Sequence, residues 1–90
     1  MINIQLPTQL SILAGGQKHL KVQASNLKEV FDQIDKIAPM IRSQIFDSNG
    51  SIRRFVSIFI NDQQITNFNK NLEPLHQDSS VLILISIAGG

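Results

Sequence analysis

The chain has 90 residues, of which 42% are hydrophobic and 17% are charged, a balance that suits one globular domain and excludes a disordered segment. It contains no cysteine, which excludes disulfides, thiolate catalysis, thiolate-bound zinc and iron–sulfur clusters. The formal net charge is +1 and acids and bases are interleaved, with Arg53-Arg54 as the only basic pair, so we expect no nucleic-acid partner.

The ends of the sequence carry no recognisable targeting signal. Met1 leads directly into a strand-like stretch, without the charged, apolar and cleavage regions of a signal peptide. The longest apolar run, Val81 to Ile85, is far shorter than the ~20 residues that a membrane helix needs. We therefore expect a cytoplasmic protein that does not contact a membrane.

The N-terminal part of the chain predicts a β-hairpin. Residues 2–6 alternate apolar and polar side chains, as a half-buried strand does, and Pro7 ends them. Gly15-Gly16 predicts a turn, because a phosphate-binding glycine loop would open a helix and the residues after it alternate like a strand. This second strand begins near Lys18 and turns Leu20 and Val22 inward.

A helix follows the hairpin. Asn26 and Glu29 have the spacing of a capping box, which marks a helix start. The apolar residues that recur on one face of this helix are Leu27, Val30, Phe31, Ile34 and Ile37. Pro39 stops the helix or begins a short second one, which the turn signal at residues 47–50 closes.

The C-terminal half predicts two further strands around an irregular segment. The stretch 53–62 reads as a strand with Val56, Ile58 and Ile60 on one side and Phe55, Ser57 and Phe59 on the other. Asn61-Asp62 marks the next turn. The irregular segment to His76 contains a short strand and is anchored by Ile65, Phe68, Leu72 and Leu75. The final strand runs from Val81 to Ile87.

This order of elements predicts an α+β fold of the ubiquitin-like β-grasp type. Its mixed sheet has one main helix packed on one face, a short second helix, and the last strand in mid-sheet beside the first. We expect one β-grasp domain over residues 1–87 and a flexible Ala-Gly-Gly tail over residues 88–90.

The final strand is apolar on both faces. Val81, Ile83, Ile85 and Ile87 would face the helix. Leu82 and Leu84, with Phe59 on the neighbouring strand, would lie on the opposite face, which no helix of the chain covers. These three residues, together with Ile87 next to the tail, predict a partner-docking surface. The alternative is that the segment 63–78 folds over them.

The chain ends in Ala88-Gly89-Gly90. Glycine has no Cβ, so such a tail can pass through a channel too narrow for other residues. Three extended residues reach roughly 10 Å. The tail therefore predicts that the α-carboxylate of Gly90 reacts inside another protein, although two adjacent glycines also occur by chance.

Four motifs follow one another along the chain: Leu6-Pro7-Thr8, Gly15-Gly16-Gln17-Lys18, the stretch from Arg54 to Asp62, and Ala88-Gly89-Gly90. Together they resemble one known family, the ubiquitin-like sulfur carriers that include MoaD and ThiS. The resemblance spans nearly the whole chain and is closest to the CysO-like branch, which carries sulfur for cysteine synthesis.

Two positions depart from the family pattern. Where the family has Asp-Gly-Asp before the last strand, this chain has Gln77-Asp78-Ser79. If that turn needs a left-handed residue, Asp78 must adopt it at a cost of about 1 kcal/mol. A proline that usually stands shortly before the tail is replaced by Ile85, which makes the exit of the strand less rigid.

The resemblance implies a carrier and not an enzyme. An E1-like enzyme of the MoeB/ThiF type would adenylate Gly90 with ATP and Mg²⁺, and a sulfur donor would then displace AMP to leave a thiocarboxylate. The further partners implied are a PLP-dependent cysteine synthase, or another sulfur-accepting enzyme, and a metal-dependent isopeptidase. The chain itself would bind no metal or cofactor, since His19 and His76 have no partner at motif spacing and are expected on the surface.

Other functions share this fold and tail. They are the MoaD-type small subunit of molybdopterin synthase, a ThiS-type carrier for thiazole synthesis, and a non-reactive interaction module or ubiquitin-like modifier. The sequence leaves the receiving enzyme open.

Overall fold

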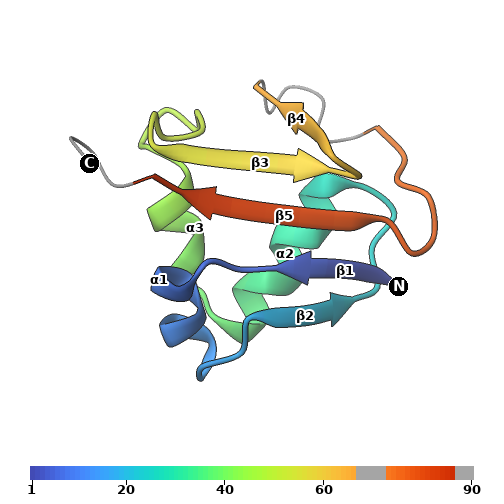
Figure 1. Ribbon diagram of the computed structural model, residues 1–90, viewed down its shortest axis with the longest axis horizontal. Helices are drawn as coiled ribbons and strands as arrows, with labels where there is room; N and C mark the ends of the chain where they lie inside the picture. The colour runs from blue at the N-terminus through green and yellow to red at the C-terminus, as the bar shows by residue number, and fades with distance from the viewer. Residues whose placement is uncertain (67–72, 87–90) are drawn as a thin grey trace.

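The computed structural model describes residues 1–66 and 73–86, and within them one mixed sheet has the strand order β2-β1-β5-β3-β4 (Figure 1). The strands are β1 (Ile2–Gln5), β2 (His19–Val22), β3 (Val56–Ile60), β4 (Gln63–Ile65) and β5 (Ser80–Ile85). β5 runs parallel to β1 and antiparallel to β3. The last strand thus lies in mid-sheet beside the first, which confirms the predicted β-grasp fold.

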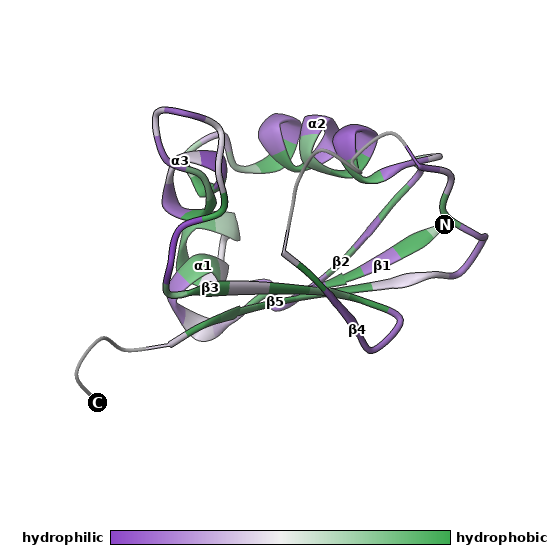
Figure 2. Cartoon of the chain, turned by 90° about the horizontal axis from the view of Figure 1, so that it is seen from above, coloured by the Kyte–Doolittle hydropathy of each residue, from purple (hydrophilic) through white to green (hydrophobic). Residues whose placement is uncertain are grey.

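The helices of the described chain are α1 (Thr8–Ser11), the 3₁₀ helix η1 (Ile12–Ala14), α2 (Leu27–Ile37) and α3 (Ile41–Ile45). α2 and α3 lie on one side of the sheet (Figure 2), and α1 follows the end of β1 (Figure 1). The sequence predicted α2 and α3 but only a connection where α1 and η1 stand. That helical segment ends at Gly15, which takes the left-handed conformation with φ 68°.

The start of α2 is capped as predicted. The Asn26 Oδ1 atom accepts a hydrogen bond of 2.9 Å from the backbone N–H of Glu29. The Glu29 side chain reaches back to the backbone N–H of Ser25, at 2.7 Å. Ile37, the last residue of α2, lies at the edge of the predicted apolar face and is 47% exposed. Ala38, which follows it, is buried.

The core fills the space between the sheet and the helices. Its buried members include Ile2 and Ile4 of β1, Ile58 of β3, Val81 and Ile83 of β5, and Val30, Phe31 and Ile34 of α2. The rings of Phe31 and Phe46 meet edge to face, with centroids 5.1 Å apart. Ile85 is only half-buried, at the end of β5.

The turns at one end of the sheet fix where β5 begins. Asp78 has φ 61°, so it adopts the left-handed conformation that this turn requires. Its carboxylate lies 3.7 Å from the amino group of Met1. Asn61, also left-handed, accepts from the backbone N–H of Ser80 at 2.9 Å and donates to Ser79 Oγ at 3.2 Å. These bonds tie the β3–β4 turn to the start of β5.

The described part of the segment 63–78 packs on the helix side. Leu75 donates its backbone N–H to Ser25 O at 2.7 Å, and Pro74 pairs with Asn26. Ile65 and Leu75 pack against the core, whereas Phe68 and Leu72 lie outside the described residues. The residues of this segment that the structure describes therefore leave the other face of the sheet uncovered. None of the described helices has the length and hydrophobicity required to cross a bilayer.

Candidate functional site

Three of the predicted docking residues share the face of the sheet that is turned away from α2. Phe59 pairs with Leu82 across β3 and β5, and Ser57 pairs with Leu84. Paired residues point to the same face, and the alternate residues of both strands are in the core, so these side chains point outward. We call Phe59, Leu82 and Leu84 the open-face patch. Leu84 is 43% exposed, whereas Phe59 and Leu82 are half-buried.

The patch continues to the point where the chain leaves the sheet. The backbone N–H of Ser86 donates to Phe55 O at 2.8 Å, which extends the β3–β5 ladder beyond Ile85. Phe55 is 42% exposed. The site prediction left Phe55 out, although the alternation along residues 53–62 had placed it with Ser57 and Phe59. Ile87, Ala88, Gly89 and Gly90, which include the predicted reactive residue, lie outside the described residues.

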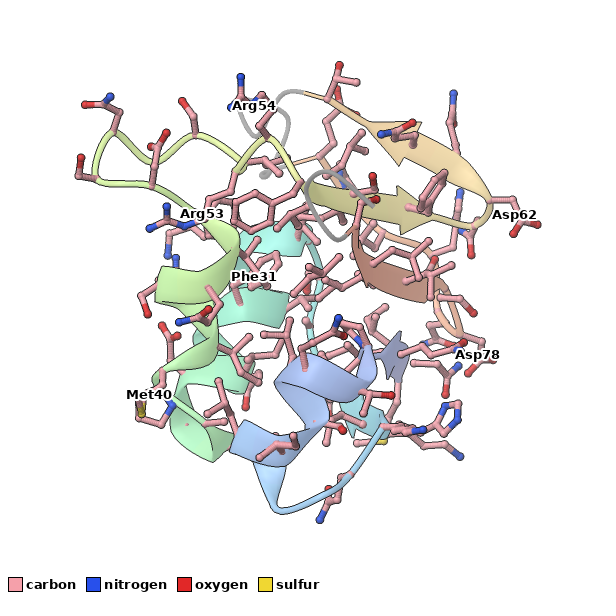
Figure 3. The ribbon with its side chains drawn as sticks, turned by 60° about the vertical axis from the view of Figure 1, so that its left-hand side comes forward. Phe31, Met40, Arg53, Arg54, Asp62 and Asp78 are labelled. Atoms are coloured by element: carbon pink, nitrogen blue, oxygen red, sulfur yellow. The ribbon has the colours of Figure 1, made fainter. Side chains whose placement is uncertain are left out.

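Charged residues are distributed unevenly around this site. Figure 3 shows Asp62 and Asp78 together at one end of the molecule and Arg53 and Arg54 at the other. The Arg53 Nε atom donates to Ser43 O at 3.0 Å, which holds the segment before β3 against α3. β5 points toward the end of the molecule at which Arg53 and Arg54 lie (Figures 1 and 3).

A groove lies beside the patch on the same face of the sheet. Its volume is about 390 Å³, and it is lined by residues of β1, β2 and β5. Gln5 of β1 pairs with His19 of β2 on one side and with Leu82 of β5 on the other. Leu82 therefore belongs to both the groove and the patch.

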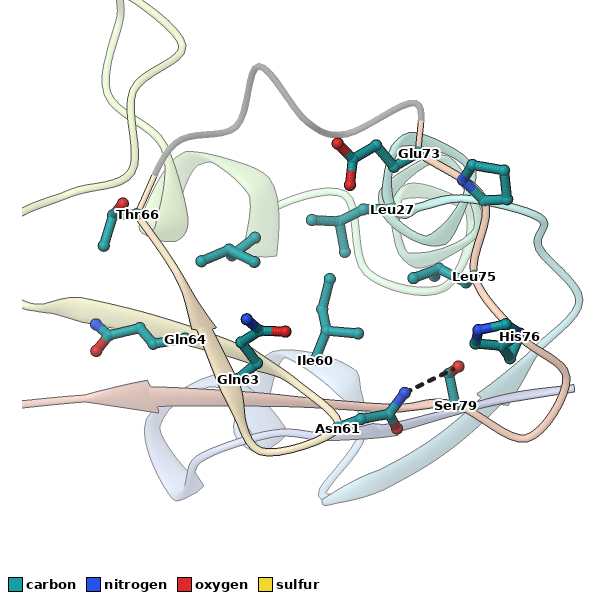
Figure 4. A pocket seen from close by; sticks show the side chains of 12 residues that line it. Leu27, Ile60, Asn61, Gln63, Gln64, Thr66, Glu73, Leu75, His76 and Ser79 are labelled. Carbon is teal, nitrogen blue, oxygen red and sulfur yellow. Dashed lines mark hydrogen bonds between the residues drawn. The ribbon is translucent and has the colours of Figure 1, made fainter.

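A second hollow, of about 440 Å³, lies on the helix side (Figure 4). Leu27, Ile60, Glu73 and His76 are among the residues that line it. The hydrogen bond drawn there joins Asn61 to Ser79 and anchors β5. Neither His19 nor His76 is buried, and no group of three or more metal-ligating side chains occurs in residues 1–66 and 73–86.

The sequence matches known sulfur carriers along its whole length. No family model matches it. It is 29% identical over 91 residues to the sulfur carrier protein CysO of Mycobacterium tuberculosis strain H37Rv, in an alignment that covers 99% of this chain and 98% of that protein. The same identity and coverage hold for CysO of Mycobacterium bovis.

Solved structures of CysO and of a related small protein show the same similarity in fold. The crystal structure of M. tuberculosis CysO superposes with a TM-score of 0.84 at 26% identity, covering 97% of this chain and 100% of that one. SAMP1 from Haloferax volcanii shares the fold, with a TM-score of 0.78, 15% identity, and coverage of 99% and 98%. The chain is therefore similar to CysO in both sequence and fold, in agreement with its resemblance to the ubiquitin-like sulfur carriers.

Proposed function

We propose that this protein carries sulfur for cysteine biosynthesis as a thiocarboxylate on Gly90. The observation that carries the proposal is the match to CysO over the full length of both chains. The terminal Ala88-Gly89-Gly90 and the exposed apolar residues near the end of β5 support it. The proposed setting is the cytoplasm.

The chemistry requires activation of an unreactive group. A carboxylate is a poor electrophile, so an oxygen of Gly90 first attacks the α-phosphate of ATP, which releases pyrophosphate and leaves an acyl-adenylate. Sulfide then attacks the carbonyl carbon, the bond to the AMP oxygen breaks, and a thiocarboxylate remains. ATP and Mg²⁺ belong to the activating enzyme. This chain contributes the terminus and no cysteine that could intercept the activated group.

The partners follow from this chemistry. They are an E1-like enzyme of the MoeB/ThiF type that adenylates Gly90, a sulfur donor, and a PLP-dependent cysteine synthase that accepts the sulfur. A metal-dependent isopeptidase would release the product from the carrier. A chain of the Amycolatopsis orientalis BexX/CysO complex superposes with a TM-score of 0.85 at 20% identity, covering all of both chains, so a protein of this fold is known in a complex.

A protein modifier is the second candidate function. Its support is the shared fold with SAMP1 of H. volcanii, and with the small archaeal modifier protein 1 of Methanosarcina acetivorans at a TM-score of 0.77. A modifier would join its terminus to a lysine amine and not to sulfur. The molybdopterin and thiazole carriers would form the same thiocarboxylate and differ only in the accepting enzyme.

Incubation with the cognate E1-like enzyme, ATP and sulfide should raise the intact mass by about 16 Da, the difference between sulfur and oxygen, because activation leads to replacement of one oxygen atom at the terminus. Intact-protein and C-terminal peptide mass spectrometry would measure and locate the change. An unchanged mass together with amide-linked adducts on lysines would favour the modifier. An unchanged mass with no adducts would favour a non-reactive interaction module.

The substitution Leu84→Asp should weaken binding to the activating enzyme by about 2 kcal/mol or more, as expected for a central interface residue. Leu84 is 43% exposed, so thermal stability should change little. Phe59→Asp is a less clean test because Phe59 is half-buried. Isothermal titration calorimetry of the activating enzyme with the wild-type carrier and with the Leu84→Asp variant would measure the change in binding. If Leu84→Asp unfolds the domain instead, Leu84 belongs to the core and the open-face patch is not a docking surface.

A further inference from the structure

The outward side chains that line the groove on the open face are one cation, Lys21, several neutral polar groups and the apolar Leu82. Its lining residues that point outward are Asn3, Gln5, His19, Lys21, Ser80 and Leu82. None of these carries a carboxylate. The described acids are elsewhere: on α2, in the loop after α3, in the turns at Asp62 and Asp78, and at Glu73 beside the helix-side hollow.

Lys21 of β2 and Lys36 of α2 both have no ion pair among the described residues, whereas two other cations of the helical face are paired. On that face Lys28 contacts Asp32 at 3.0 Å, and Arg42 contacts Asp35 at 2.9 Å. Lys21 is exposed, and no ion pair of Lys21 occurs within residues 1–66 and 73–86. Its cross-strand partner is the neutral Asn3. An unpaired cation beside amide side chains complements an acidic surface better than a neutral one.

The other flank of the patch has a different character. Phe59 pairs with Gln64 of β4, which is neutral. Because Leu82 lines both groove and patch, a partner that covers the patch also meets the groove. Of the two strands that flank the patch along the sheet, the side of β1 and β2 therefore offers a cation to that partner, and β4 does not.

We propose that the partner which covers the open-face patch also places an acidic segment in the groove over β1 and β2. The partner is the activating enzyme, so this inference rests on the proposed function. The apolar patch supplies the contact area, and the groove supplies charge complementarity that speeds association and sets the orientation. Leu82 joins the two parts.

Charge reversal at Lys21 tests this inference. In steady-state adenylation of the full chain by the E1-like enzyme, Lys21→Glu should raise KM for the carrier about three- to tenfold at low ionic strength, with kcat nearly unchanged. The increase should shrink as salt is added, because exposed charges are screened. The matched control is Lys36→Glu on α2, which changes the net charge equally and should leave KM close to the wild-type value.

A second variant guards against an effect on folding. Gln5→Glu is nearly isosteric, adds one negative charge inside the groove, and should raise KM in the same salt-dependent way. Equal KM values for Lys21→Glu and Lys36→Glu would overturn the inference, as would a KM for Gln5→Glu equal to that of the wild type. If the wild-type chain is not adenylated at all, the proposed function fails and not this inference alone.

Discussion

Deletion of Gly90 should abolish thiocarboxylate formation and leave the domain folded. The reacting carboxylate then moves back by one residue and no longer reaches the adenylate site, because one extended residue spans about 3.5 Å. Gly89→Ala should impair activation for a related reason, since its methyl group must enter a channel that fits only glycine. Intact mass after incubation with enzyme, ATP and sulfide measures both effects, and thermal unfolding measures stability. The buried core of the described chain ends at Ile83, so neither change should lower the melting temperature.

A glycine elsewhere in the chain provides the matched control. Gly16 has φ 87°, and a Cβ placed there would meet no atom within 4 Å. Gly16→Ala should therefore destabilise the domain by about 1 kcal/mol through backbone strain while leaving activation unchanged. The two substitutions should show opposite patterns. Early melting of Gly89→Ala, or its activation at the normal rate, would contradict the idea that the tail passes through a narrow channel.

The fold could be predicted because each local signal agreed with its tertiary role. The alternation along β1, β2, β3 and β5 matches the burial of their inward residues, and Asn26 caps α2 as its spacing with Glu29 predicts. The left-handed conformation of Asp78 agrees with the resemblance, which implies a glycine in that turn. Where pattern and environment coincide, the sequence is sufficient.

The errors arose where packing and not periodicity decides the outcome. The segment that forms α1 and η1 is too short to show a helical period, and Gly15-Gly16 indicates a turn without indicating the helix that ends there. The helical spacing places Ile37 on the apolar face of α2, but the helix ends at that residue, so its side chain is not covered. The pattern identified the outward residues of β3 and β5 but not their exposure, which depends on neighbouring side chains. Leu84 and Phe55 are consequently more accessible than Phe59 and Leu82.

Truncation of Ile83 to alanine should lower the free energy of unfolding by about 2–5 kcal/mol, as large-to-small changes in a core do. Ile83 is fully buried, lies opposite Ile58 in the central pair of strands, and belongs to the same core as Phe31 of α2. Removing its side chain leaves a cavity between sheet and helix that a rigid sheet cannot close. For a domain whose total stability is roughly 5–15 kcal/mol, this is a large share.

Leu84→Ala is the matched control, because it removes a side chain of the same size from the next residue of the same strand. Leu84 points to the open face and is 43% exposed, so its truncation should cost less than about 1 kcal/mol. Urea unfolding of both variants would measure the difference between the two faces of β5. In the binding assay the order of the two effects should be the opposite. Leu84→Ala should weaken association with the activating enzyme, whereas Ile83→Ala should not, when it is measured at temperatures where this variant is folded. Similar losses of stability in the two variants would mean that the open face is packed, and the assignment of one face to stability and the other to docking would be wrong.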